Sequence, residues 1–437
     1  MIVMGGIIGA GIFTNPSVVA RQLRSPGFMM SAWAIGGLIA LIGAFVYAEL
    51  AALKPEVGGQ YAYLRDAYHP IVAFLYGWTL LLVVQTGGMA AAAIIFGHYF
   101  VELSGLAIAP GLIAAVTLAV LTIVNCLGVK SGSNVQSALM LTKLVVIAML
   151  VGVGWIMLGP ASQAPRIVAA AGTTGAGTAS GNQAIGLATA MVPVLFAFGG
   201  WQTASFVSGE MKEPRRDLPR GLLFGVIGVI VLYLAVSYVC LRALGPSGLA
   251  ATDTPASAVM RLALGERGAR LIALGIAIST VGFLSQSILT APRVYFAMAR
   301  DGVFFKAVGW LNPRTQAPVV AIVLQGVWAA AIAFSGHYDR ILNYVEAIDV
   351  LFFGLTGASL IVFRRREARA RTGATDDRIR TPLHPVTTIL FVTATWAISI
   401  TTVVRYPADA GIGVGVLAVG AIVYWLWASK RSMLRRT

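Results

Sequence analysis

The chain has 437 residues, of which 58% are apolar and only 11% carry a charge, and its formal net charge is +15. Ordinary soluble domains carry a charge on about 25% of their residues, and a soluble protein of this size could not bury so much apolar surface. The composition therefore excludes a soluble enzyme, a disordered chain and a disulfide-rich secreted scaffold, and it predicts a membrane protein with many spans.

Apolar runs recur along the whole chain, and each is close to the roughly 20 residues that a helix needs to cross a bilayer. We predict about twelve transmembrane helices, over residues 2–22, 28–53, 70–101, 109–128, 135–158, 184–208, 219–243, 267–298, 317–335, 341–363, 384–404 and 409–428. Between them, residues 159–183 are rich in Gly, Ala, Ser and Thr and are expected to form a flexible external loop. Residues 364–381 are expected to form a charged internal loop.

The basic residues predict the orientation. With the N-terminus inside and twelve alternating helices, most of the 32 Lys and Arg residues fall on internal segments, as the positive-inside rule requires. We therefore expect a plasma (cell inner) membrane protein with both termini in the cytoplasm. Because the charges lie in short gaps between apolar runs, they do not indicate a nucleic-acid partner. The start of the chain lacks a basic region and a cleavage site, so it is not a signal peptide.

Two of the predicted helices contain clusters that weaken a helix. The first contains the run 5–13, GGIIGAGIF, and the sixth contains FAFGGW at 196–201, shortly after Pro193. Glycine destabilises a helix interior and lets other groups approach the backbone. Interruptions in corresponding helices of two repeats point to the midplane site of a transporter. The alternative is close helix packing through small residues.

Four ordered stretches carry a family resemblance: 6–13, GIIGAGIF; 48–68, AELAALKPEVGGQYAYLRDAY; 196–221, FAFGGWQTASFVSGEMKEPRRDLPRG; and 291–305, APRVYFAMARDGVFF. With them the chain resembles the amino acid–polyamine–organocation superfamily, most of all its L-type amino acid transporter branch.

The resemblance implies an all-α polytopic fold of the leucine-transporter type. Residues 1–158 would form the first inverted repeat, with helix one broken near 9–13. Residues 184–363 would form the second repeat, with helix six broken near 196–201, and residues 384–428 two further helices. Family members usually have a cytoplasmic stretch before helix one, whereas this sequence begins inside that helix; a truncated sequence and a start that was assigned late are both left open.

A bound amino acid presents one carboxylate and one ammonium group, and unwound backbone can satisfy both without an ionised side chain. Following the family pattern, we expect N–H groups of Ala10, Gly11 and Ile12 to bind the carboxylate. Carbonyl groups would bind the ammonium, from Ile7, Ile8, Phe196, Ala197 and Gly199. The position of Phe196 resembles the aromatic gate of the family, and Trp201 is expected in a pocket or packing role; core packing is the alternative for both.

Lys143, Glu346 and Asp349 lie inside predicted spans, where an ionisable group is a functional hypothesis. The resemblance suggests that Lys143 occupies the place of a sodium ion, touches helix one and takes part in coupling or gating; the alternative is a lysine that snorkels to the interface. Glu346 and Asp349 are i, i+3 neighbours on one helix face. Asp349 is expected to take up a proton or to pair with a cationic substrate, unless it is a hydrogen-bonded structural acid.

We expect no cofactor, no metal site and no enzymatic activity. The four histidines, His69, His98, His337 and His384, have no ligand spacing. Cys126 and Cys240 suggest neither a metal site nor a bridge. In eukaryotic relatives of the branch, a Cys between helices three and four tethers a single-span partner. Residues 102–110 contain no Cys, so no disulfide-linked subunit is expected.

The predicted function is amino acid transport that is independent of sodium and works by exchange or with protons, with neutral substrates favoured. The alternatives are a cationic amino acid or polyamine permease, or a non-transporting receptor or scaffold of the same fold.

Overall fold

The computed structural model describes residues 2–54, 58–127, 133–157, 183–206, 213–335, 337–370 and 379–434. Within these ranges every regular element is helical, so the predicted all-helical membrane fold is confirmed. The predicted loop at 159–183 lies outside the described residues, except for Gln183.

The helices follow the predicted spans closely, and their order along the chain is as follows. They are α1 (Ile2–Ile7), η1 (Gly11–Phe13), α2 (Asn15–Gln22), α3 (Pro26–Leu53), α4 (Gln60–Ala67), α5 (Pro70–Thr79), η2 (Leu80–Val84), α6 (Gln85–Ser104), α7 (Pro110–Cys126), α8 (Ser133–Met157), α9 (Gln183–Phe198), α10 (Thr203–Phe206), α11 (Pro214–Ala250), α12 (Pro255–Thr290), α13 (Pro292–Arg300), η6 (Lys306–Gly309), α14 (Val319–Phe334), α15 (Tyr338–Ala370), α16 (Val386–Arg405) and α17 (Pro407–Leu434).

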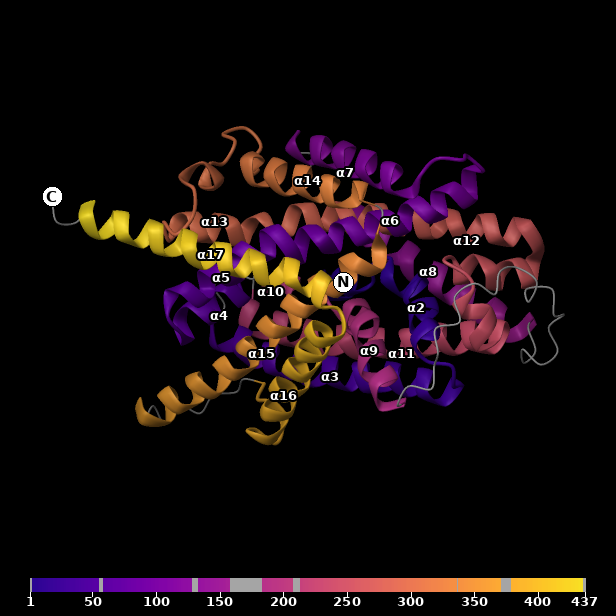
Figure 1. The fold of residues 1–437 in the computed structure, drawn as a ribbon, viewed down its shortest axis with the longest axis horizontal. Helices are drawn as coiled ribbons and strands as arrows, with labels where there is room; N and C mark the ends of the chain where they lie inside the picture. Colours follow the sequence, from indigo (N-terminus) through magenta and orange to yellow (C-terminus); the bar gives the residue numbers. More distant parts are fainter. Residues whose placement is uncertain are drawn as a thin grey trace.

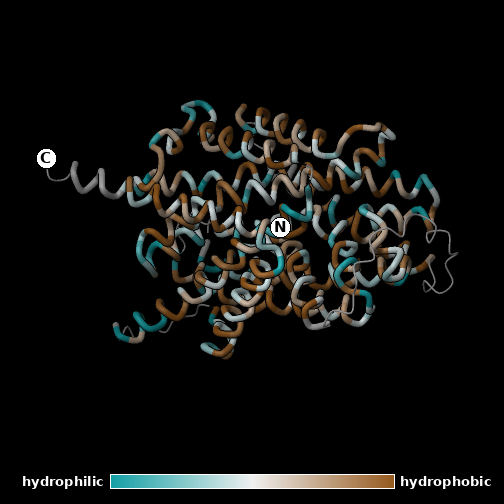
Figure 2. Tube along the Cα trace, viewed as in Figure 1, coloured by the Kyte–Doolittle hydropathy of each residue, from teal (hydrophilic) through white to brown (hydrophobic). Residues whose placement is uncertain are grey.

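Among the described residues, eight helical segments are long and apolar enough to cross a membrane, and three shorter apolar helices accompany them. Figure 1 shows several of the long helices, such as α6, α12 and α17, running along the longest axis of the molecule. The tube in Figure 2 is mostly hydrophobic along the helices, and hydrophilic stretches lie mainly in the turns that join them. This distribution is the one that a bilayer requires, because its core offers no partners for polar groups.

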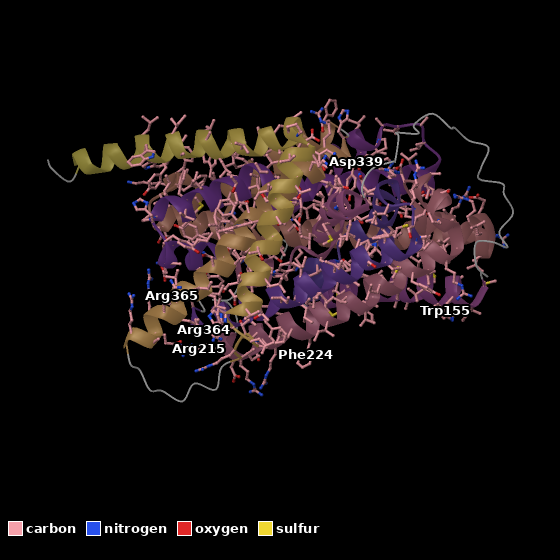
Figure 3. All side chains as sticks on the ribbon, turned by 60° about the horizontal axis from the view of Figure 1, so that its bottom comes forward. Trp155, Arg215, Phe224, Asp339, Arg364 and Arg365 are labelled. Atoms are coloured by element: carbon pink, nitrogen blue, oxygen red, sulfur yellow. The ribbon has the colours of Figure 1, made fainter. Side chains whose placement is uncertain are left out.

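One prediction about a loop is wrong. Residues 364–370, which we expected to begin a charged loop, continue α15 as far as Ala370. Arg, Glu and Ala all favour helix, so the sequence RRREARA extends the helix beyond its apolar part. Residues 371–378 of the same predicted loop lie outside the described ranges. Figure 3 shows Arg364 and Arg365 toward one end of the long axis and Trp155 toward the other.

At the end of α15, Arg364 forms a bidentate ion pair with a fully buried carboxylate on α3. Its Nε and Nη2 lie 2.7 and 2.8 Å from the Glu49 oxygens, and the N–H of Thr381 donates to Glu49 at 2.7 Å. Fork-to-fork geometry of this kind gives the strongest side-chain hydrogen bonds. The network therefore ties α15 and the chain that follows it to α3.

The short helix α4 carries a second polar network at the same end of the molecule. Tyr61 Oη and Arg65 Nη1 donate to Asp301 Oδ2 at 2.9 and 3.0 Å, and Lys54 Nζ lies 2.9 Å from Asp66 Oδ2. Burial raises the pKa of Asp66, but hydrogen bonds from Lys54 and Arg65 outweigh it, so this pKa lies below its usual value. These contacts hold α4 against the segment that follows α13.

The third span is continuous but irregular. It consists of α5, a π-helical stretch η2 and α6, and Thr86 Oγ1 donates to Leu81 O, five residues back, at 2.8 Å. A π-helical turn places one extra residue in the helix and often marks a functional site. The extra residue in this stretch rotates α6 about its axis and thereby determines which of its side chains face the interior.

Candidate functional site

The first span is interrupted between Ile7 and Gly11. The first half, α1, ends at Ile7, and the chain resumes as the single turn η1 before α2. At the break, Gly9 N donates to Ile7 O at 2.7 Å, and Phe13 N donates to Ala10 O at 3.0 Å. The first residues of η1 have no acceptor earlier in their own helix, so their N–H groups are available to an anion.

The second interruption separates α9 from α10, over residues 199–202. Gly200 has a φ of +97°, a conformation that favours glycine. Its N–H donates to Gln202 Oε1 at 2.9 Å, and its carbonyl accepts from Thr203 Oγ1 at 2.7 Å. Phe196 and Ala197 lie in the last turn of α9, where carbonyl groups have no donor within the helix.

The two breaks touch each other. A Cβ placed on Gly6 would lie 3.0 Å from the Gly200 carbonyl and 2.7 Å from Thr203 Oγ1, and a Cβ on Gly200 would meet the Gly6 carbonyl. Residues from both breaks, from η2 and α6, and from α12 and α15 line one cavity. They are Gly6, Ile7, Gly9, Ala10, Gly11, Val84, Gln85, Gly88, Met89, Ala92, Phe196, Ala197, Gly199, Gly200, Gln202, Thr203, Phe283, Gln286, Ser287, Thr290, Val345, Glu346 and Asp349.

Lys143 on α8 is buried, with only 2% of its surface exposed. Its Nζ donates to Ile8 O at 2.8 Å and to Gly5 O at 3.0 Å, and it lies 5.7 Å from the centre of the Phe283 ring. The side chain therefore binds two carbonyl groups of the interrupted first span and does not snorkel. It stands behind the cavity wall that Phe283 forms.

The predicted site residues divide into two groups. The structure places seven of them on the cavity wall: Ile7, Ala10, Gly11, Phe196, Ala197, Gly199 and Asp349. The others lie behind it. The Ile8 carbonyl is bound by Lys143, and Ile12 is fully buried in the surrounding core. Trp201 stacks on Phe353, with ring centres 5.0 Å apart, and its Nε1 has no partner among the described residues.

Sequence reasoning missed the polar side chains that other helices contribute to the wall. These are Gln85, Gln202 and Gln286, which share the wall with Glu346, a residue that the sequence analysis did name. Each of these Gln residues lies among apolar residues of a predicted span, and this isolated polar side chain could have indicated a position on the cavity wall. Tyr233 was missed too, although its Oη donates to Ile7 O at 3.0 Å.

Asn15 holds α2, the second half of the first span. Its Nδ2 donates to Pro193 O on α9 at 2.7 Å, and its Oδ1 accepts from Tyr338 Oη on α15 at 2.7 Å. Near the end of α2, Arg21 donates to the carbonyl groups of Ala250 and Thr252 and pairs with Asp253. This half is thus fastened to three other parts of the bundle.

Among the residues that the structure describes, there is no group of three or more His, Cys, Asp or Glu side chains that could hold a metal ion. The residues that line the cavity offer backbone N–H and carbonyl groups, amide side chains and two carboxylates. Such groups can hydrogen-bond a small polar solute.

Comparisons with known proteins agree with this chemistry. A family model described as "Amino acid permease" matches residues 1–427. The b(0,+)-type amino acid transporter 1 of Mus musculus is 29% identical over 372 residues, which cover 83% of this chain and 74% of that protein. The large neutral amino acids transporter small subunit 2 of Homo sapiens is 28% identical over 451 residues, which cover 98% of this chain and 79% of that protein.

Proposed function

Because this chain belongs to the amino acid permease family, we propose that it is a secondary transporter that moves amino acids by alternating access, without sodium, by exchange or together with protons. The observation that carries the proposal is that two interrupted helices border one cavity. Interrupted helices at a central cavity expose backbone groups that bind a charged solute without an ionised side chain. Membership of the family makes the chain a multi-pass membrane permease and not an enzyme.

In this proposal the two breaks recognise the part that all α-amino acids share. The carboxylate binds at the start of η1, through the N–H groups of Ala10 and Gly11, two residues that line the cavity. The ammonium binds at the end of α9, where the carbonyl groups of Phe196 and Ala197 lack helical donors. Phe196 is partly buried on the wall and serves as the cover over the bound solute.

Lys143 supplies the reason for sodium independence. Its ammonium binds Gly5 O and Ile8 O, so a cation already stabilises the docked first span. Release of these two contacts would let α1 swing away and open the cavity to the other side. In this proposal a sodium ion is not needed to stabilise the docked first span.

The residues on the cavity wall favour particular classes of substrate side chain. Val84, Met89 and Val345 offer apolar contacts that fit the neutral side chains favoured by the sequence. Glu346 and Asp349 favour the alternative, a cationic side chain.

The test is a counterflow screen of labelled amino acids in proteoliposomes, repeated with and without gradients of protons and sodium. We expect uptake that is unchanged by sodium. A strict requirement for a sodium gradient would contradict the role of Lys143. Absence of transport for every amino acid, from correctly folded protein, would favour the receptor or scaffold alternative.

The carboxylate site has its own test. A Cβ on Gly11 would lie 3.4 Å from Asn15 Nδ2 and 3.5 Å from Ala197 Cα, which is ordinary contact. We therefore expect Gly11→Ala to fold and to weaken binding modestly, whereas the branched side chain of Gly11→Val fills the site and abolishes binding. If both variants bind substrate with the affinity of the parent, the proposal that the substrate carboxylate binds at η1 is wrong.

We also propose that residues 1–158 and 184–363 are inverted repeats, that 384–428 add two helices, and that both termini are cytoplasmic. In a background without Cys126 and Cys240, a cysteine at Glu266 should react from outside intact cells. A cysteine at Arg365 should react only after permeabilisation. The opposite pattern would reverse the orientation.

A partner subunit is not needed in this proposal, although one relative is named a small subunit. Activity of the purified single chain in proteoliposomes tests this point. Activity that appears only when a second protein is added would overturn it.

A further inference from the structure

Two carboxylates stand on the cavity wall, one helical turn apart on α15. Glu346 is 2% exposed and Asp349 is 8% exposed, and both line the cavity. Among the described residues, neither carboxylate has a hydrogen bond or an ion pair, and Glu346 Oε1 is a buried oxygen without a donor. Buried polar groups of native proteins are nearly always paired, so these oxygens indicate a partner other than the residues that the structure describes.

The charge balance of the cavity points to the same conclusion. Within the described part of the chain, its wall includes both carboxylates but no Lys, Arg or His side chain. The buried cation Lys143 is already bound to Gly5 O and Ile8 O and lies behind Phe283. A buried carboxylate without a counter-charge is unfavourable, and removing one partner of a buried ion pair is costly for the same reason.

The position of the two acids complements the backbone site. The α-carboxylate and α-ammonium of a solute bind at η1 and α9 in the proposed function, whereas Glu346 and Asp349 come from α15. The same wall also carries apolar side chains, among them Val84, Met89 and Val345. In the proposal, a solute held at the breaks lays the hydrocarbon stem of its side chain against such residues, and the end of the side chain meets the acids.

We propose that Glu346 and Asp349 bind the cationic end of the substrate side chain, so that the transported class is amino acids with a guanidinium or a second ammonium group. The inference rests on the proposed function, because it assigns one more part of the same cavity. A guanidinium group suits this site well, since its planar set of N–H donors can meet two carboxylates at once.

The alternative for such a pair is that both acids are neutral and make the cavity merely polar. The two states differ in one respect that can be measured. A neutral pair would not distinguish a charged side chain from an uncharged one of the same shape, whereas an ionised pair would prefer the charged one.

Arginine and citrulline form a suitable pair of probes, because they have the same length and differ by a guanidinium in place of a urea group. Binding of each to the purified full chain, with leucine as a third probe, gives the comparison. We expect arginine to bind at least about tenfold more tightly than citrulline, which corresponds to ~1.4 kcal/mol. Asp349→Asn and Glu346→Gln, which keep shape and remove charge, should each reduce this preference about tenfold or more.

The control variant is Glu102→Gln. Its carboxylate pairs with Arg261 and does not line the cavity, so the ratio of arginine to citrulline should stay at the parental value. Citrulline binding at the parental affinity in Asp349→Asn or Glu346→Gln would show that these variants fold.

The outcomes separate the two proposals. Preference for arginine that is lost in both amide variants supports the inference. Tight binding of leucine or citrulline with no preference for arginine overturns it and leaves the proposed function standing. Failure of all three amino acids to bind overturns the proposed function, and the inference with it.

Discussion

The two interruptions that border the cavity are held in different ways. The break in the first span is fixed by side chains from other helices, namely Lys143 on α8 and Tyr233 on α11. The break between α9 and α10 is fixed by its own residues, through the bonds that Gly200 makes with Gln202 and Thr203. A break held from outside can be released when its neighbours move, whereas a self-contained break keeps its shape. For the alternating access proposed above, the comparison predicts that α1 is the moving part and that the segment 199–202 is the fixed one.

The largest effect is expected from a change at the fixed break. Gly200→Ala places a side chain at a φ of +97° and drives it against the Gly6 carbonyl. The left-handed conformation alone costs about 1–2 kcal/mol, and the collision adds to it. We expect substrate affinity to fall more than about a hundredfold, measured by equilibrium binding to purified protein.

Gly199→Ala is the matched control for that variant. Its Cβ would lie 3.4 Å from the carbonyl oxygens of Leu195 and Phe196, without a positive φ. We expect it to bind far better than Gly200→Ala. Equal losses in the two variants would mean that the segment is not rigid in the way described.

The next effect is expected at the moving break. Lys143→Ala removes the donor from two buried acceptors, at a cost of about 1–3 kcal/mol, which is roughly one to two decades in a conformational equilibrium. Turnover in proteoliposomes should fall by that factor while insertion stays normal. Thr142→Val, a change at the partly exposed neighbouring residue, should transport at the parental rate. A parental rate for Lys143→Ala itself would remove the lysine from the mechanism.

The smallest effects sharpen the difference between the breaks. Tyr233→Phe and Thr203→Val each remove one hydrogen bond, worth about 0.5–1.5 kcal/mol, or a factor of a few up to about tenfold. Because Tyr233 holds the moving part, its loss should change the rate of transport more than the affinity. Loss of the Thr203 hydroxyl should change the affinity more than the rate. The reverse assignment in paired measurements of binding and uptake would exchange the roles of the two breaks.

Apolar composition made the helices predictable. A run of about 20 apolar residues forms a helix in a bilayer because the helix satisfies the backbone hydrogen bonds within the segment. In most cases the predicted spans agree with the described helices to within a few residues. Glycine clusters likewise indicated where the first and sixth spans are interrupted. These signals are local, and each can be read from a short stretch of sequence.

The side of a helix that each residue faces was harder to predict. Trp201 lies only one residue beyond Gly200, yet it packs on Phe353 behind the cavity wall. Asn15 gave no sign that it would join α2 to both α9 and α15. Such contacts depend on how distant helices cross, and periodicity within one span carries no information about that.

The π-helical stretch Leu80–Val84 affects how the cavity lining can change in evolution. One residue inserted into a helix rotates everything after it by about 100° relative to a regular α-helix. Gln85, Gly88, Met89 and Ala92 reach the wall on that rotated face. Loss of a single codon within this stretch would turn a different set of α6 side chains inward, so the lining of the site can change through a change in length alone, with no substitution at any residue that faces the solute.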